Sequence, residues 1–236
     1  MKSHWVTLTA ADGAAVDAFV AVPGAGPAAG VIVLQEIFGV NAFVRQVVER
    51  LAEAGYTAIA PDLFSRQERR VELDSSVEVE RDRAMQLMAG LDQGMAISDA
   101  ITAGAYLRAN HALCDGRVGA VGYCLGGRLA YLLAARGEVQ AAVGYYGVGI
   151  EKALAETSSR SAPMLLHVAG DDHLCPPAAQ QQITTGLRAF SDRVEVTIHD
   201  AVGHGFARTG GPAYNPTAAR RADAATLAFL SSTLRG

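Results

Sequence analysis

The chain has 236 residues, of which 50% are hydrophobic and 19% charged, and its formal net charge is −4. This composition is typical of a soluble globular protein with one substantial core, and its acidic balance without Lys/Arg runs argues against a nucleic-acid-binding protein. No apolar run approaches the roughly 18 residues that a membrane span requires.

The N-terminus and the cysteines indicate the cellular setting. Residues 1–5 contain no apolar core of a signal peptide, and Cys114, Cys124 and Cys175 are an odd number without the spacing of a disulfide framework. We therefore expect reduced thiols and a cytoplasmic location. Because no repeat or linker interrupts the sequence, we also expect a single domain over residues 1–236. A monomer is a separate expectation.

The first half of the chain predicts a β-hairpin followed by alternating strands and helices. Asp12-Gly13 is a turn signal between strands at 6–9 and 16–22, and residues 23–27 form a Pro/Gly loop. The continuous apolar run at 30–34 predicts a strand covered on both faces. The further elements expected here are a helix capped by Asn41 and running to about Ala54, a strand at 57–60, an irregular charged segment at 63–76, and helices at 77–91 and 93–110.

The second half continues the alternation. We expect strands at 118–121, 141–146, 164–169 and 194–198. We expect helices at 128–136, at 178–190 and at 216–234. Strands that alternate with helices predict an α/β fold with a mostly parallel, doubly wound sheet of about eight strands flanked by helices. In such a sheet the loops at the carboxyl ends of the strands carry the functional residues.

One of these loops contains a candidate nucleophile. The stretch Gly122-Tyr123-Cys124-Leu125-Gly126-Gly127 lies between an apolar strand and a helix, with glycine two residues on either side of Cys124. This is the pattern of a nucleophile elbow, in which a Cβ at Gly122 or Gly126 would meet neighbouring backbone. A helix N-terminus at this turn favours a thiolate. The alternative is a small cysteine buried in the core.

A base and an acid follow Cys124 in the order typical of α/β-hydrolases. His204 comes after the final strand, and Asp171-Asp172 after the strand before it. His204 would move the thiol proton and activate water, while an aspartate would fix the tautomer of its imidazole. The sequence pattern does not choose between Asp171 and Asp172. The backbone N–H groups of Leu125 and Ile37 would bind the oxyanion.

Four motifs are similar to those of dienelactone hydrolases, and the similarity covers nearly the whole chain. They are Gln35-Glu36-Ile37-Phe38-Gly39-Val40-Asn41, the elbow, residues 144–149 (GYYGVG) and residues 203–209 (GHGFART). The resemblance implies an α/β-hydrolase that needs no cofactor or metal. It implies hydrolysis of dienelactone (4-carboxymethylenebut-2-en-4-olide), an enol-lactone, to maleylacetate in the bacterial degradation of chlorinated aromatic compounds. It also selects Asp172 as the acid.

The resemblance further implies a substrate-binding site. Glu36 matches a family carboxylate that takes the proton of the thiol once substrate is bound; otherwise it would be a solvated loop acid. Arg81 and Arg208 match two arginines that bind the substrate carboxylate, for which a guanidinium fork is suited. For Arg81 the alternative is a solvated helix with salt bridges.

Other residues concern specificity. Phe38 belongs to the first motif, and Tyr145 is a candidate pocket or gate residue, with an ordinary core aromatic as the alternative. Met85 and Met88 stand where aromatic residues often occur in the family, and Gly205 stands where a serine is familiar. We interpret Cys175 as structural.

Two other functions are alternatives to the hydrolysis of dienelactone. The first is a carboxylesterase with broader or different small-ester specificity on the same fold, which would not need a carboxylate on its substrate. The second is a non-catalytic thiol-sensing or binding protein, although no resolving cysteine lies near Cys124 in the sequence. The leading expectation is a cysteine hydrolase of small anionic lactones or esters that binds neither nucleic acid nor membrane.

Overall fold

The computed structural model describes residues 1–24 and 26–235. Ala25, within the predicted loop at 23–27, and Gly236 lie outside the described residues. The chain divides into two compact units, residues 1–119 and 120–236, which are described one at a time. A single domain over the whole chain therefore stays a prediction.

The described residues form eight strands in the hydrogen-bonded order β1-β2-β4-β3-β5-β6-β7-β8. The strands are β1 (Lys2–Thr9), β2 (Ala15–Val22), β3 (Ala28–Leu34), β4 (Thr57–Pro61), β5 (Cys114–Tyr123), β6 (Ala142–Tyr145), β7 (Met164–Ala169) and β8 (Val194–His199). The α-helices are α1 (Ala42–Glu53), α2 (Glu78–Ala89), α3 (Gln93–Ala109), α4 (Leu125–Ala135), α5 (Pro177–Gly186) and α6 (Pro216–Leu234). The predicted mostly parallel α/β fold is confirmed. Over residues 1–24 and 26–235, no helix is long and apolar enough to cross a membrane.

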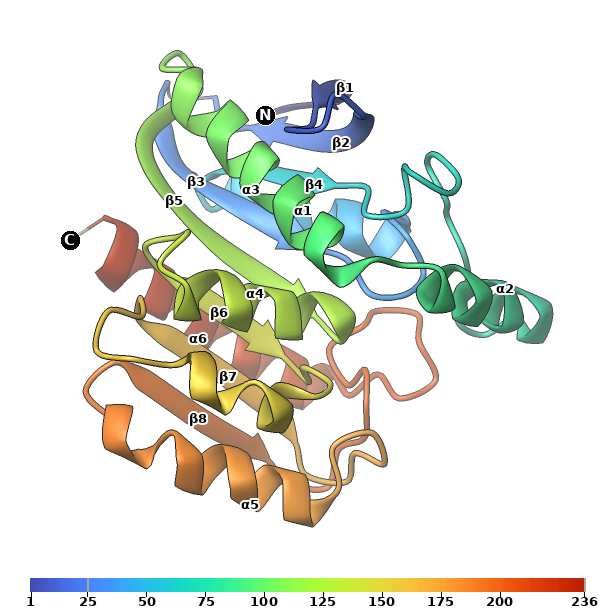
Figure 1. Ribbon diagram of the computed structural model, residues 1–236, viewed down its shortest axis with the longest axis vertical. Helices are drawn as coiled ribbons and strands as arrows, with labels where there is room; N and C mark the ends of the chain where they lie inside the picture. Colours follow the sequence, from blue (N-terminus) through green and yellow to red (C-terminus); the bar gives the residue numbers. More distant parts are fainter. Residues whose placement is uncertain (25, 236) are drawn as a thin grey trace. The chain divides into compact units, whose positions relative to one another are not determined.

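In the first unit, β1 and β2 form the predicted hairpin, and β2 pairs antiparallel with β4. Strands β3 and β4 are parallel, with Gly30 opposite Thr57. Helices α1 and α3 pack on opposite faces of these strands (Figure 1). Helix α1 begins after Asn41 as predicted, since the side chain of Asn41 accepts a hydrogen bond from the N–H of Val44 at 3.3 Å.

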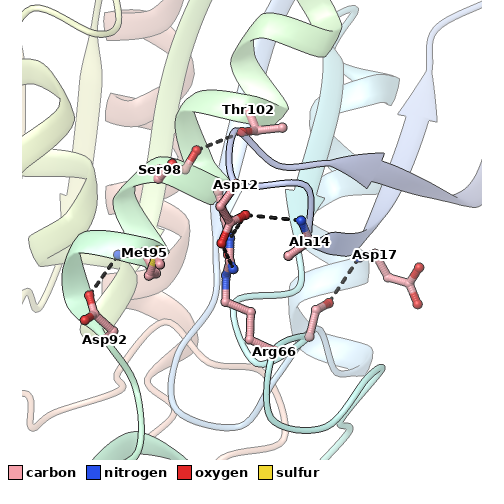
Figure 2. Close-up of polar contacts among 10 residues, drawn as sticks. Asp12, Ala14, Asp17, Arg66, Asp92, Met95, Ser98 and Thr102 are labelled. Carbon is pink, nitrogen blue, oxygen red and sulfur yellow. Dashed lines mark hydrogen bonds and ion pairs between the residues drawn. The ribbon is translucent and has the colours of Figure 1, made fainter.

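Arg66 joins the hairpin to α3 within the first unit. Asp12, in the hairpin turn, accepts a hydrogen bond from the N–H of Ala14 and pairs with Arg66 at 2.6 Å (Figure 2). Arg66 also pairs with the buried carboxylate of Asp99 on α3 at 2.7 Å. A buried carboxylate needs such a partner, so Arg66 satisfies a charge as well as linking two elements.

In the second unit, all neighbouring strands from the end of β5 to β8 are parallel. Helices α4 and α6 lie on opposite faces of these strands (Figure 1). Strands β6 and β7 are buried along their whole length, as their apolar sequences predict. The parallel arrangement brings the loops that follow β5, β6, β7 and β8 to one edge.

The differences in length from the prediction are clearest in three elements. Strand β1 starts at Lys2 rather than Val6 because it pairs with β2 along its full length, although its first residues are exposed. Strand β5 starts at Cys114, before an exposed stretch in which Asp115 and Arg117 form an ion pair. Helix α5 ends at Gly186, and a separate 3₁₀ turn, Arg188–Phe190, occupies the rest of the predicted helix.

A chain of hydrogen bonds runs through the core between β7, β8 and α6. His167 Nδ1 lies 3.0 Å from His199 Nε2, and His167 Nε2 lies 3.1 Å from the hydroxyl of Thr226. The hydroxyl of Tyr145 lies 2.7 Å from that of Thr226 and donates to Asp223 at 3.0 Å. Both histidines are neutral in this arrangement, since burial lowers the pKa of His167 to about 3 and also lowers the pKa of His199.

This histidine pair should make the fold sensitive to acid. The unfolded chain binds a proton at His167 near pH 6.5, whereas the folded chain binds it only near pH 3, so stability falls as the pH drops below about 6.5. Each proton contributes a slope of at most about 1.4 kcal/mol per pH unit. We expect His167→Gln to lower overall stability but to flatten its pH dependence between pH 7 and 5 in urea unfolding. His173→Gln is the control because His173 is exposed; parallel curves for wild type and His167→Gln would contradict this expectation.

Candidate active site

The turn after β5 has the geometry of a nucleophile elbow. Cys124 joins β5 to α4 with φ 54°, a left-handed value that is unusual for a residue with a side chain. A Cβ on Gly122 would lie 1.9 Å from the carbonyl oxygen of Gly126, which confirms the steric reason for glycine at position 122. Gly127 meets a similar limit, since its Cβ would lie 2.6 Å from the carbonyl oxygen of Tyr145. The turn therefore tolerates no side chain at Gly122 or Gly127.

His204 connects the elbow to the loop after β7. Its Nδ1 donates to Asp172 Oδ2 at 2.7 Å, and the imidazole also hydrogen-bonds the side chain of Cys124. Since Nδ1 is engaged by Asp172, Nε2 is the nitrogen available to the thiol. The structure thus brings together Cys124, His204 and Asp172, which follow three different strands of the second unit.

The structure distinguishes the two aspartates that the sequence pattern left open. The side chain of Asp172 is fully buried, and its Oδ1 accepts the N–H of Leu174 at 2.8 Å while its Oδ2 accepts His204. Asp171 is exposed, and its backbone N–H donates to the carbonyl of Val202 at 3.0 Å. That backbone bond fastens the loop of the acid to the loop of the histidine, so Asp172 faces inward.

The charges at this cluster favour a protonated imidazole. Burial alone would lower the pKa of His204, but its hydrogen bonds to Asp172 and Cys124 and the charges of both groups outweigh burial and raise that pKa to about 10. Around neutral pH, His204 therefore holds a proton between a carboxylate and the sulfur.

Two residues that support the cluster were not predicted. Gln180, on α5, donates its side-chain amide to the carbonyls of Gly170 and Cys175 at 3.0 and 2.9 Å and thereby holds the loop that carries Asp172. Tyr146 packs its ring edge-to-face against His204, with the ring centres 5.0 Å apart. Tyr146 could have been suspected from its place at the end of β6, whereas no motif marks Gln180.

Comparisons with known proteins give the family. The model of the dienelactone hydrolase family matches residues 16–234. The chain belongs to this family. Among curated relatives, a carboxymethylenebutenolidase of Pseudomonas putida is 40% identical over 231 residues, which cover 98% of this chain and 97% of the relative. Carboxymethylenebutenolidase 1 of Cupriavidus pinatubonensis is 36% identical and covers 98% and 97% of the two chains.

A solved structure agrees with this assignment. The structure of a putative dienelactone hydrolase from Klebsiella pneumoniae has a TM-score of 0.81 and is 26% identical, with 98% of this chain and 99% of that chain covered. The expected resemblance to dienelactone hydrolases and the expected α/β-hydrolase fold are therefore confirmed. Membership of a hydrolase family also confirms the interpretation of the chain as a hydrolase.

The other predicted residues of the second unit lie in different settings. Leu125 is the first residue of α4, so its N–H has no acceptor in a preceding helical turn. Arg208 is 9% exposed and lies in the loop of His204. Tyr145 is fully buried and hydrogen-bonded to Thr226 and Asp223, which is the setting of a core aromatic, and its role as a pocket or gate residue stays a prediction.

The remaining predicted residues belong to the first unit. Glu36 follows β3 and is 1% exposed, so it is not the solvated loop acid of the alternative interpretation. Ile37 and Phe38 follow it and are half-buried and buried, respectively. Arg81, on α2, donates to the carbonyls of Ser75 and Ser76 at 3.0 and 3.1 Å.

The last three residues singled out in the sequence are the two methionines of α2 and Cys175. Met85 is 60% exposed, and Met88 is half-buried. Cys175 is buried, and burial raises the pKa of its thiol to about 11. A thiol with such a pKa is protonated at neutral pH, in keeping with the structural interpretation of Cys175.

Proposed function

We propose that this dienelactone hydrolase family member hydrolyses dienelactone to maleylacetate through a thioester on Cys124. The observation that carries the proposal is the imidazole of His204, which is hydrogen-bonded to Asp172 on one side and to Cys124 on the other. Curated relatives named carboxymethylenebutenolidase, at up to 40% identity over nearly the whole chain, support the choice of substrate.

The proposed reaction has two halves. The thiolate of Cys124 adds to the lactone carbonyl, and the N–H of Leu125, with that of Ile37 as the resemblance implies, binds the oxyanion. The ring C–O bond then breaks, the imidazolium of His204 gives its proton to the departing enolate oxygen, and the acyl group stays on sulfur. The neutral His204 next takes a proton from water, and the resulting hydroxide adds to the thioester carbonyl. The C–S bond then breaks, the carboxylic acid product leaves, and the thiolate and the protonated His204 are restored.

The proposal also includes residues that bind the substrate or transfer a proton from the thiol. The resemblance assigns Glu36 to proton transfer from the thiol, and Arg81 and Arg208 to the substrate carboxylate. We propose that Phe38, Met85 and Met88 also contact the substrate. Steady-state turnover of the dienelactone isomers by the purified protein tests the proposed substrate. Turnover of p-nitrophenyl acetate with no measurable turnover of dienelactone would favour the carboxylesterase alternative.

Removing either proposed carboxylate ligand should affect charged substrates selectively. A charge-assisted contact is worth roughly 1.5–3 kcal/mol, so we expect Arg208→Ala and Arg81→Ala each to lower kcat/KM for dienelactone by about tenfold to over a hundredfold, with a raised KM. The neutral p-nitrophenyl acetate has no carboxylate and should be far less affected. Equal losses on both substrates would show that the arginines are structural.

A further inference from the structure

The loop after His204 curls around the side chain of Arg208. The N–H of Arg208 donates to the carbonyl of Gly205 at 2.9 Å, and the N–H of Gly211 donates to the carbonyl of Arg208 at 3.1 Å. Arg208 is 9% exposed, so its side chain lies within this loop and not in solvent. The two backbone hydrogen bonds fix the glycines before and after the arginine relative to its main chain.

Both glycines lie directly against the side chain of Arg208. A Cβ on Gly205 would lie 3.0 Å from Nη2 and 3.3 Å from Cζ of Arg208. A Cβ on Gly211 would lie 2.6 Å from Nε of the same side chain and 3.2 Å from the carbonyl oxygen of Arg208. Carbon and nitrogen atoms that are not bonded do not normally approach so closely, and the buried side chain has little room to move aside. The side chain of Arg208 therefore occupies space that a Cβ at either glycine would enter.

We propose that Gly205 and Gly211 are positioning residues that form a slot for the guanidinium of Arg208 and so set the preference for substrates with a carboxylate. This inference rests on the proposed function, in which Arg208 binds that carboxylate. A bidentate contact requires a fixed guanidinium plane, and a displacement of about 1 Å can cost around a hundredfold in rate. The slot has no comparable effect on a substrate without a carboxylate.

The loop offers a matched control for the contact. Gly211 has no left-handed φ, so Gly211→Ala adds a methyl group against Arg208 without backbone strain from φ. Gly210 has φ 80° and no atom within 4 Å of an added Cβ, so Gly210→Ala adds backbone strain without the contact. Gly205→Ala combines the two effects, because Gly205 has φ 83°. The first two variants separate displacement of the arginine from general disturbance of the loop.

The test compares kcat/KM for dienelactone and for p-nitrophenyl acetate. We expect Gly211→Ala to lower the value for dienelactone by about tenfold or more, mainly through KM, and to leave the value for the neutral ester within about twofold. Gly210→Ala should stay within about twofold on both substrates, because surface changes without contacts have small effects. In an Arg208→Ala background, Gly211→Ala should cause no further selective loss, since the group that it displaces is gone.

The outcomes separate this inference from the proposed function. If Arg208→Ala lowers kcat/KM for dienelactone selectively and Gly211→Ala does not, the slot alone is overturned. The slot is also overturned if Gly211→Ala lowers kcat/KM equally for dienelactone and for p-nitrophenyl acetate. Equal losses on both substrates in Arg208→Ala would overturn the carboxylate contact and the slot with it. If Gly211→Ala does not fold by circular dichroism, the double variant with Arg208→Ala should fold because the 2.6 Å contact with the arginine side chain is removed and only the 3.2 Å contact with the backbone carbonyl of residue 208 remains. Failure of the double variant to fold would also overturn the inference.

Discussion

Cys124→Ala should abolish measurable turnover of dienelactone while leaving the fold intact. Alanine keeps a Cβ at the same backbone angles, so the elbow loses only its sulfur. Without a nucleophile no acyl-enzyme can form, and residual catalysis from the oxyanion donors is typically lower by several orders of magnitude. Steady-state kinetics measure the loss, and circular dichroism verifies the fold. Near-normal rates in this variant would show that the thiol is not the nucleophile.

Two further measurements identify the thiol itself. Iodoacetamide should inactivate the wild type by alkylating Cys124, and Cys175→Ala should remain equally sensitive, because Cys175 is buried with a raised thiol pKa. Cys124→Ser should be much weaker than the wild type, since the pKa of serine is poorly matched to a base that serves a thiol. Mass spectrometry of the alkylated protein locates the modified residue.

Asp172→Asn should lower kcat by two or more orders of magnitude. Asp172 fixes the tautomer of His204 through a 2.7 Å hydrogen bond, and loss of that tautomer costs about 10⁴-fold in a serine triad. The same carboxylate raises the pKa of His204, so the variant should have a weaker base for the thiol proton. Alkylation of Cys124 by iodoacetamide at pH 7 should therefore slow together with turnover.

Asp171→Asn is the matched comparison because it changes the neighbouring, exposed carboxylate. The backbone bond from Asp171 to Val202 does not involve the side chain, so this variant should retain most of its activity and its rate of alkylation. The reverse ranking of Asp171→Asn and Asp172→Asn would contradict the assignment of the acid.

The sequence predicts an element best where a chemical signal marks at least one of its ends. Helix α6 begins and ends at the predicted residues because Asn215 caps it and a proline occupies its first position. Strand β7 is also as predicted, since its apolar run stops at Gly170. The start of β1 was missed because pairing with β2, and not hydrophobicity, makes its exposed residues a strand.

The candidate site was predictable to a different degree at each residue. The elbow is local, so the spacing of its glycines indicates Cys124 as a nucleophile. The choice between Asp171 and Asp172 depends on which side chain turns toward His204, and a long-range backbone bond fixes that turn. Gln180 was not predictable, because its three hydrogen bonds reach carbonyl groups that the sequence pattern cannot place near it.

The left-handed backbone of Cys124 sets stability and catalysis against each other at one position. A non-glycine residue held at such angles destabilises a fold by about 1–3 kcal/mol, a strain that glycine would relieve. Selection for heat resistance alone would therefore favour replacement of Cys124, whereas under the proposed function a demand for hydrolysis would retain it. Engineering for thermostability in this chain consequently needs an activity screen at every round, or position 124 must be held constant.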